Sequence, residues 1–225
     1  MPKLVSVQVG LPRQMGRDDA TDPFDKPWTS GIFKSPVSGP VEIGRYGLVG
    51  DGQADLENHG GADKAVLSYS ADHYPDWLPI LGPDSATYGA FGENLTIQGL
   101  TEGEVCIGDI WQVGDRVQLQ VSQPRQPCWK LARKWRVRDL VEQVQQNGRT
   151  GWYWRVVQTG DVEAGQTLTL LSRTRPEWTI AAANQAMHHR KSDRDAALVL
   201  AELPELAASW RRHFAGRAAR LNAGS

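Results

Sequence analysis

The sequence predicts a mainly β, barrel-like domain with a few helices, followed by a small three-helix domain. Short apolar segments recur between residues 91 and 122 at spacings of roughly ten residues, which is typical of the strands of barrels and sandwiches. Gly-Asp pairs separate several of these segments as turns. After residue 175 the pattern changes to stretches rich in Ala, Leu and Arg with helical spacing. We therefore expect a first domain at residues 1–175 and a second at 176–225.

The N-terminal part alternates between strand patterns and polar segments. Residues 3–9 alternate like a half-buried strand, and short strands are expected at 32–34 and 41–43. Residues 10–30 are rich in Gly, Pro and Asp and lack periodicity, so we expect a long surface loop there. Residues 47–64 are polar and turn-forming in the same way.

The rest of the first domain combines short strands with three helices. Residues 65–69 read as a buried strand, and 72–81 carry apolar residues at helical spacing, with Gly82 as a stop signal. Further strands are expected at 94–97, 105–107, 110–113, 117–121, 152–157 and 167–171, and further helices at 127–135 and 137–146. The tail is expected to form helices at 179–188, 193–203 and 205–221, with Ser192 as an N-cap and Pro204 between the last two.

Composition limits the classes of protein that this chain can belong to. Its 225 residues are 40% apolar and 23% charged, which fits a globular protein. Two cysteines cannot build a four-cysteine zinc or iron–sulfur site, and they suggest a reducing compartment. Cys106, inside an apolar segment, is expected to be a small buried hydrophobe. No apolar run is long enough for a membrane span, so we expect a cytoplasmic protein without membrane association.

The residues around Cys128 form the most informative motif. Pro127 suits the first position of a helix, because its fixed φ is helical and its missing N–H has no partner there. Cys128 is then expected in the first helical turn, where free N–H groups favour the thiolate. Arg125, Lys130 and Arg133 add positive charge in sequence. A thiolate binds soft metals or attacks electrophiles, whereas the alternative is an inert thiol at a strand–helix junction.

A second motif is His59-Gly60-Gly61-Ala62-Asp63-Lys64. Two adjacent glycines can let consecutive N–H groups converge on an anion, and Lys64 adds a positive charge. A simple tight turn is the alternative interpretation.

Several polar residues elsewhere are candidates with an ordinary structural alternative. In Phe91-Gly92-Glu93-Asn94, the asparagine can hydrogen-bond a heterocycle or an oxo group and the glutamate can pass a proton, or the segment is a turn that enters a strand. Asp51 and Asp55 are either loop caps or site carboxylates. The Thr150–Tyr153 segment either forms an aromatic wall or packs in the core, which is the commoner use of aromatic residues in strands.

In their order and spacing these motifs resemble the MOSC family, named for the C-terminal domain of molybdenum cofactor sulfurase. The resemblance covers about 30–172 and runs through Gly50-Asp51, His59–Lys64, Phe91–Asn94, Val121–Cys128, Thr150–Tyr153 and the closing β segment. The whole chain resembles stand-alone bacterial YiiM-type members of the family, in which a small 3-alpha domain follows the MOSC domain.

The resemblance implies a β-barrel-like fold and a molybdenum cofactor (molybdopterin) with Cys128 as the metal ligand. It also implies reduction of N-hydroxylated compounds, such as 6-hydroxylaminopurine, as a detoxification. The catalytic candidates are then Cys128, His59, Glu93 and Asp51. The cofactor-binding candidates are His59, Gly60, Gly61, Lys64, Asn94, Arg125 and Lys130. Because the chain shows neither flavin nor iron–sulfur motifs, electrons are expected from a separate donor protein.

Two other functions remain open at this point. A cofactor or sulfur carrier would use Cys128 for storage or as a persulfide, without turnover. A nucleic-acid-binding module would use the tail arginines 211, 212, 217 and 220, although nine Lys/Arg against five Asp/Glu in residues 173–225 is too small an excess to favour it. The tail holds no cysteine, so we expect it to supply no metal ligand and to pack on the barrel or in a homodimer.

Overall fold

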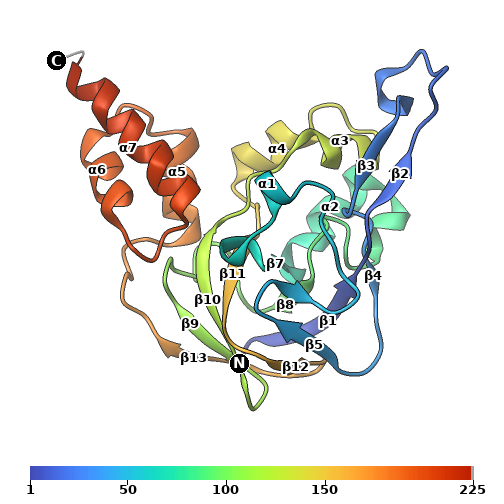
Figure 1. Ribbon diagram of the computed structural model, residues 1–225, viewed down its shortest axis with the longest axis horizontal. Helices are drawn as coiled ribbons and strands as arrows, with labels where there is room; N and C mark the ends of the chain where they lie inside the picture. The colour runs from blue at the N-terminus through green and yellow to red at the C-terminus, as the bar shows by residue number, and fades with distance from the viewer. Residues whose placement is uncertain (224–225) are drawn as a thin grey trace.

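The computed structural model describes residues 1–223, without the side chain of Asn58; Gly224 and Ser225, at the end of the predicted second domain, lie outside it. An eight-stranded sheet dominates the first domain (Figure 1). All its neighbouring strands are antiparallel except β7 and β8, which are parallel. In spatial order the strands are β13 (Leu168–Ser172), β9 (Ile110–Val113), β10 (Val117–Pro124), β11 (Trp152–Gln158), β7 (Val66–Ser70), β8 (Leu95–Gln98), β1 (Lys3–Val9) and β4 (Ser35–Pro36).

The sheet closes into a barrel through main-chain hydrogen bonds between its two ends. Leu4 N in β1 donates to Gln166 O at 2.9 Å, and Leu168 N in β13 donates to Pro2 O at 3.0 Å. Closure pairs strand edges that would otherwise be exposed. The mainly β, barrel-like fold class is therefore confirmed.

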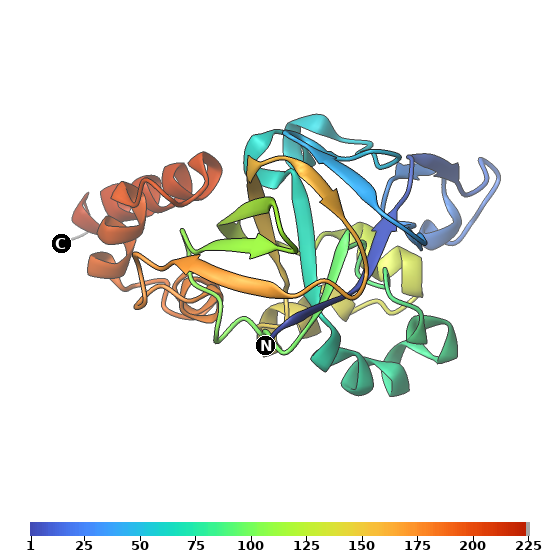
Figure 2. The same cartoon turned by 90° about the horizontal axis from the view of Figure 1, so that it is seen from below.

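The smaller strands correct several expectations. A second sheet joins β12 (Gly160–Val162), β5 (Val41–Gly44) and β6 (Gly47–Leu48). The expected loop at 10–30 contains a hairpin, β2 (Arg13–Met15) with β3 (Trp28–Ser30), at the end of the barrel far from the tail (Figure 2). The strand expected at 32–34 is absent, and the one expected at 105–107 is reduced to a single bridge between Cys106 and Thr179.

Three helices of the first domain, α2 (Tyr74–Leu81), α3 (Trp129–Trp135) and α4 (Leu140–Asn147), pack beside the barrel on a core of their own. The domain also contains the short helix α1 (Leu56–His59) and the 3-10 turns η1 (Pro23–Asp25), η2 (Ala62–Lys64), η3 (Ala71–His73) and η4 (Pro83–Ala86). Tyr69 stacks on Phe91 with ring centroids 4.0 Å apart, and Leu131 and Leu140 pack in the same cluster. This cluster supports the segments that carry Phe91 and Cys128.

The three tail helices, α5 (Ile180–His188), α6 (Arg194–Glu202) and α7 (Ala208–Ala223), are docked on the barrel rather than separate from it. A single apolar cluster includes barrel residues such as Ile107 and tail residues such as Leu206. Asp193, instead of the expected Ser192, caps α6. Arg217, one of the arginines considered for nucleic acid, is buried and donates to Met187 O at 2.9 Å.

Polar contacts fix the start of α7 to the His59–Lys64 motif. Asp63 accepts a hydrogen bond from Ala208 N at 3.1 Å and forms an ion pair with Arg155 at 2.6 Å. Arg155 also donates to Glu205 O at 2.6 Å. Over residues 1–223, no helix combines the length and the apolar character that a membrane crossing needs.

Candidate functional site

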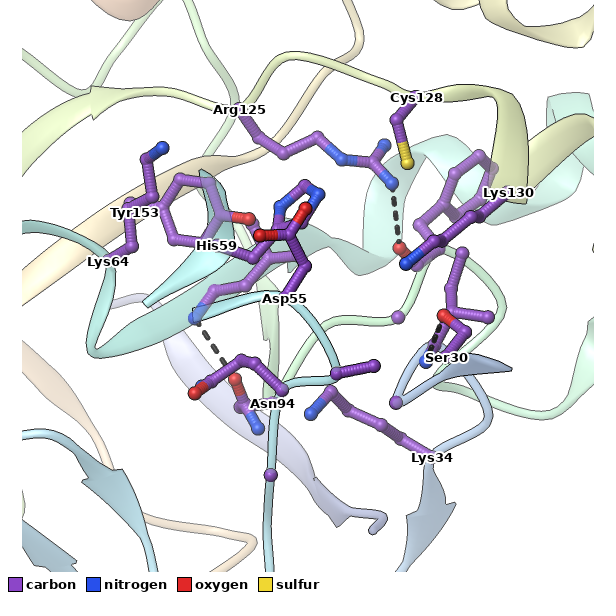
Figure 3. Close-up of a pocket in the computed structure, with 18 residues that line it drawn as sticks. Ser30, Lys34, Asp55, His59, Lys64, Asn94, Arg125, Cys128, Lys130 and Tyr153 are labelled. Carbon is purple, nitrogen blue, oxygen red and sulfur yellow. Dashed lines mark hydrogen bonds between the residues drawn. The ribbon is translucent and has the colours of Figure 1, made fainter. Parts of the chain in front are cut away.

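One pocket gathers most of the site residues predicted from the sequence (Figure 3). The predicted residues that line it are His59, Lys64, Asn94, Arg125, Cys128 and Lys130. They come from α1, η2, the residue before β8, the connection from β10 to α3 and the first turn of α3, so segments distant in sequence meet here. The β2–β3 hairpin and the strand β11 add Ser30 and Tyr153 to the wall.

Cys128 lies at the N-cap of α3, one position before the first turn in which we expected it. Its φ of −116° and ψ of 167° are extended, so the helix begins at Trp129 and Pro127 precedes the cap. The Cys128 side chain makes no capping hydrogen bond and is partly exposed. The thiol points toward the guanidinium of Arg125 across the pocket (Figure 3).

Arg125 is buried, and one of its guanidinium nitrogens lacks a partner. Its Nη2 donates to Phe91 O at 3.1 Å, whereas Nη1 has no hydrogen-bond acceptor among the described residues. A buried donor without an acceptor costs free energy, and a native structure leaves few of them. An anionic group in the pocket would supply the missing acceptor.

The Thr150–Tyr153 motif explains how Arg125 is placed. Gly151 has a φ of 72°, and a Cβ there would lie 2.3 Å from Ser68 O, so only glycine lets this backbone approach β7 so closely. Gly151 O in turn accepts a hydrogen bond from Arg125 N at 3.0 Å. The glycine therefore fixes the backbone from which the arginine reaches into the pocket.

Lysines increase the positive charge of the pocket. Burial lowers the pKa of Lys34, and its ion pair with Asp51 only partly offsets that effect. Burial also lowers the pKa of Lys64, partly offset by Asp63 and Asp55. With Arg125 and Lys130, four Lys/Arg side chains line a pocket in which Asp55 is the single lining carboxylate among the described residues.

His59 is neutral near pH 7 in this environment. Burial lowers its pKa, and the charges of Lys64, Lys130 and Arg125 lower it further against the opposing effect of Asp55. The neighbouring glycines do not form the expected two-amide nest, because Gly60 N donates to Leu56 O at 3.1 Å at the end of α1. Neither Gly60 nor Gly61 is among the residues that line the pocket.

Asp51 and Asn94 form a network behind the pocket wall. Asp51 accepts hydrogen bonds from Gly10 N at 3.0 Å, from Lys34 Nζ and from Asn94 Nδ2 at 2.9 Å. Asn94 Oδ1 accepts from Leu67 N at 3.1 Å. Asp51 thus positions Lys34 and Asn94 instead of lining the pocket itself.

Glu93 also lies outside the pocket. Its side chain is fully buried and accepts hydrogen bonds from Gly89 N at 2.7 Å, Phe91 N at 3.0 Å and Thr96 Oγ1 at 3.0 Å, as well as from the Tyr74 hydroxyl. These bonds occupy both carboxylate oxygens. The structure therefore places the side chain where it holds the loop that presents Phe91 and Asn94.

Sequence reasoning missed three residues of this region. Lys34 lies in the segment expected to be a strand, and no sequence signal distinguishes it. Lys134 donates to Gly89 O at 2.8 Å, and burial lowers its pKa to about 8. Tyr153 lines the pocket although core packing was favoured for it, and burial raises its pKa to about 12, with Arg125 opposing. The available signal for Tyr153 was the aromatic-wall alternative for the Thr150–Tyr153 segment.

The donor set fits an anionic cofactor that brings its own metal. Residues 1–223 contain no group of three or more His, Cys, Asp or Glu side chains that could hold a bare metal ion. The pocket instead offers a single soft sulfur, Cys128, surrounded by cations. A metal that carries its own sulfur ligands, attached to a phosphate-bearing group, matches that combination in softness and in charge.

Comparisons with known proteins agree with the fold and the motifs. The MOSC domain model matches residues 55–169, and the model of the YiiM-like 3-alpha helix domain matches residues 178–220. YflK of Bacillus subtilis is 43% identical over 218 residues, covering 97% of this chain and 95% of that protein. A reductase of Gibberella moniliformis is 40% identical over 164 residues, which cover 72% of this chain and 29% of that protein.

A solved structure gives the same result. The crystal structure of YiiM from Geobacillus stearothermophilus superposes with a TM-score of 0.80 at 37% identity, covering 97% of this chain and all of the other. The two domain models match consecutive parts of this chain, and the superposition extends over both. The chain therefore belongs to the MOSC family, as a stand-alone YiiM-type member in which the 3-alpha helix domain follows the MOSC domain.

Proposed function

We propose that this protein is a molybdenum-cofactor-dependent oxidoreductase that reduces N-hydroxylated small molecules, with 6-hydroxylaminopurine-type bases as representative substrates and detoxification as its role. The observation that carries the proposal is the partly exposed thiol of Cys128 in a cation-lined pocket, beside an Arg125 nitrogen that lacks an acceptor. The MOSC family and a relative named reductase support the oxidoreductase class.

In this proposal the chain binds the cofactor through one sulfur and several cations. Cys128 is the protein's ligand to molybdenum, because thiolates suit metals that already carry sulfur ligands. Lys64, Arg125 and Lys130 hold the anionic part of the cofactor through charge-assisted hydrogen bonds. Lys34, which Asp51 fixes in place, adds a fourth positive charge.

The bound cofactor supplies a two-electron reduction, in which the N–O bond of an N-hydroxylated substrate breaks and, with two protons, the amine and water leave. We assign proton delivery to His59, whose imidazole lines the pocket and whose lowered pKa an anionic cofactor would raise again. Asp51 and Glu93 are positioning residues in this assignment, because their oxygens are occupied by hydrogen bonds to neighbouring segments.

Electrons would reach the pocket from a separate donor protein. The sequence contains two cysteines and no Gly-x-Gly-x-x-Gly motif, so it lacks the usual elements of an iron–sulfur or flavin site. The donor would dock on the surface near Cys128, where the adjacent Trp129 is 52% exposed.

Metal analysis and turnover test the proposal together. Protein isolated from cells that make the cofactor should contain molybdenum and, with a chemical reductant, should convert 6-hydroxylaminopurine to adenine. Molybdenum without turnover would favour the alternative, a cofactor carrier. Protein that neither retains molybdenum nor turns over would overturn both.

A further inference from the structure

A second hollow continues from the pocket into the space between the barrel and the tail helices. It shares Asp55, His59, Lys64, Cys128 and Tyr153 with the pocket. We call this second hollow the groove. Beyond the shared residues, its barrel side is lined by Gln123, Gln126, Pro127 and Trp129, and its tail side by Met187, Ser209, Trp210 and His213.

The groove differs from the pocket in charge. Apart from the shared residues, its lining holds amide, hydroxyl, thioether and indole side chains. His213 is neutral near pH 7, because burial and the neighbouring Arg217 lower its pKa. The groove therefore offers aromatic surface and neutral hydrogen-bonding groups, without a formal charge of its own.

Two residues that line the groove have side chains with unused hydrogen-bonding capacity. Trp210 is 2% exposed, and its Nε1 has no acceptor among the described residues. Gln126, on the barrel side, is exposed and makes no side-chain hydrogen bond within residues 1–223. An amide of this kind can both donate to and accept from the edge of a heterocycle.

The two walls of the groove are held at a fixed separation. Ala207 N donates to Ser122 O at 2.9 Å, and Ser209 Oγ contacts Gln123 Oε1 at 3.4 Å. The capping of α7 by Asp63 adds a third tie. The groove is therefore a preformed feature of the fold, as small-molecule sites commonly are.

We propose that the groove binds the ring of the substrate, a neutral and flat heteroaromatic group, and that it directs the N-hydroxyl group toward Cys128. This inference rests on the proposed function. An anionic cofactor is drawn to the cations of the pocket, whereas a neutral ring gains contact area on aromatic and thioether surfaces and hydrogen bonds from amides. The tail domain thereby forms one wall of the substrate site.

Adenine, the product of 6-hydroxylaminopurine reduction, is a suitable probe. Ser209 is exposed at the start of α7, so Ser209→Trp places an indole in the groove, whereas Ala215→Trp places one on an exposed part of α7 that does not line it. Calorimetric titration of the cofactor-loaded protein should show adenine affinity reduced at least roughly tenfold by Ser209→Trp, corresponding to ~1.4 kcal/mol, and unchanged by Ala215→Trp. Molybdenum content should be equal in all three proteins.

A milder variant guards against misfolding of Ser209→Trp. Gln126→Ala removes an exposed side chain that packs in no core, and it should weaken adenine binding severalfold with unchanged thermal stability. Adenine affinity that is equal in wild type, Ser209→Trp and Gln126→Ala, or wild-type protein that does not bind adenine, would overturn the assignment of the groove.

Failure of the proposed function gives a different result. If the isolated protein contained no molybdenum but bound adenine, and Ser209→Trp weakened that binding, the groove assignment would stand. The proposed dependence on the molybdenum cofactor would then be wrong. If Ser209→Trp and Gln126→Ala turned over 6-hydroxylaminopurine with unchanged KM, the proposed function would stand and the groove would not be the substrate site.

Discussion

The pocket and the groove share Cys128 but differ in the charge of their remaining walls. The pocket gathers Lys34, Lys64, Arg125 and Lys130, and burial lowers the pKa of both Lys34 and Lys64. The groove adds only neutral groups to the shared residues. The two hollows therefore suit molecules of different charge.

The difference also concerns stability. A buried cation is costly unless its hydrogen-bonding groups are satisfied, and Arg125 is buried in the pocket with one nitrogen that lacks an acceptor among the described residues. A groove of indole, thioether and amide groups carries no comparable cost. Residues that lower the stability of the fold are expected at functional sites, and Arg125 in the pocket is such a residue.

The largest effect is expected from Cys128, where the two hollows meet. Cys128→Ser replaces a soft ligand with a harder and less acidic oxygen, so molybdenum retention and turnover should both be lost while the fold is kept. Cys106→Ser is the control: Cys106 is buried near Pro176 O, away from the pocket, and this change should affect stability alone. Equal molybdenum content in wild type and Cys128→Ser, measured by elemental analysis, would contradict the ligand assignment.

A smaller effect is expected from removing one pocket charge. Lys64→Ala should weaken cofactor binding, because a charge-assisted contact typically contributes ~1.5–3 kcal/mol, or roughly ten- to over a hundredfold in affinity. Lys3→Ala removes the same charge from an exposed strand position and should leave occupancy unchanged. Molybdenum occupancy at limiting cofactor measures both. If Lys64→Ala kept its full molybdenum content but lost catalytic rate, the lysine would instead act on the substrate in the groove.

A variant of Asp63 tests whether the His59–Lys64 motif stabilises the docking of α7 on the barrel. Burial raises the pKa of Asp63, but the hydrogen bonds from Arg155 and from Ala208 N outweigh it and hold the pKa below its usual value. Asp63→Ala should therefore lower the free energy of unfolding by about 1–2 kcal/mol, as for the loss of a helix cap with a partly exposed ion pair. Urea denaturation measures this change, and Asp161→Ala, on an exposed strand position, is the control.

The same carboxylate gives a pH dependence with a defined sign. Because the folded-state pKa is depressed, the stabilisation by Asp63 is complete above the unfolded-state pKa near 4 and is lost as pH falls through the folded-state value. The difference in stability between wild type and Asp63→Ala should therefore shrink below about pH 4. A difference that stays constant down to pH 2 would contradict this role.

The smallest effect concerns His59. Burial, followed by the charge of Lys64, lowers its pKa in the cofactor-free protein, so its ring should titrate below about 6.5 in NMR spectra. An anionic cofactor in the pocket should raise that pKa, because a nearby negative charge favours the protonated ring. His213, in the groove, should shift much less. If cofactor loading shifted the pKa of His59 and the pKa of His213 equally, the proposed difference in charge between pocket and groove would be wrong.

Local patterns predicted most of the fold, and tertiary pairing explains the errors. Alternation and turn residues located the barrel strands, and helical spacing located the tail. The hairpin within residues 10–30 was missed because each of its strands has three residues, too few for a periodic pattern. The strand expected around Cys106 fails because the segment pairs with the tail at Thr179 and not with the barrel.

The candidate site was predictable where its residues are close in sequence. Arg125, Cys128 and Lys130 lie within six residues at the start of α3, so their convergence could be expected. Lys34 could not, because Asp51 holds it in place from another segment. Glu93 has a suitable side chain, but the tight turn before it directs the carboxylate into its own loop, and a sequence does not reveal such a direction.

The closure of the barrel has a consequence for how the protein is made. The bonds of Leu4 with Gly165 and Gln166 join the first strand to a segment near the end of the domain, and contacts so distant in sequence form slowly because a long loop must close first. During synthesis the edge of the first strand at Leu4 stays unpaired until that segment has left the ribosome, whereas the opposite edge can pair with β8 earlier. The capping of α7 by Asp63 comes later still. Insertion of a cofactor would accordingly be a late event that follows translation of nearly the whole chain.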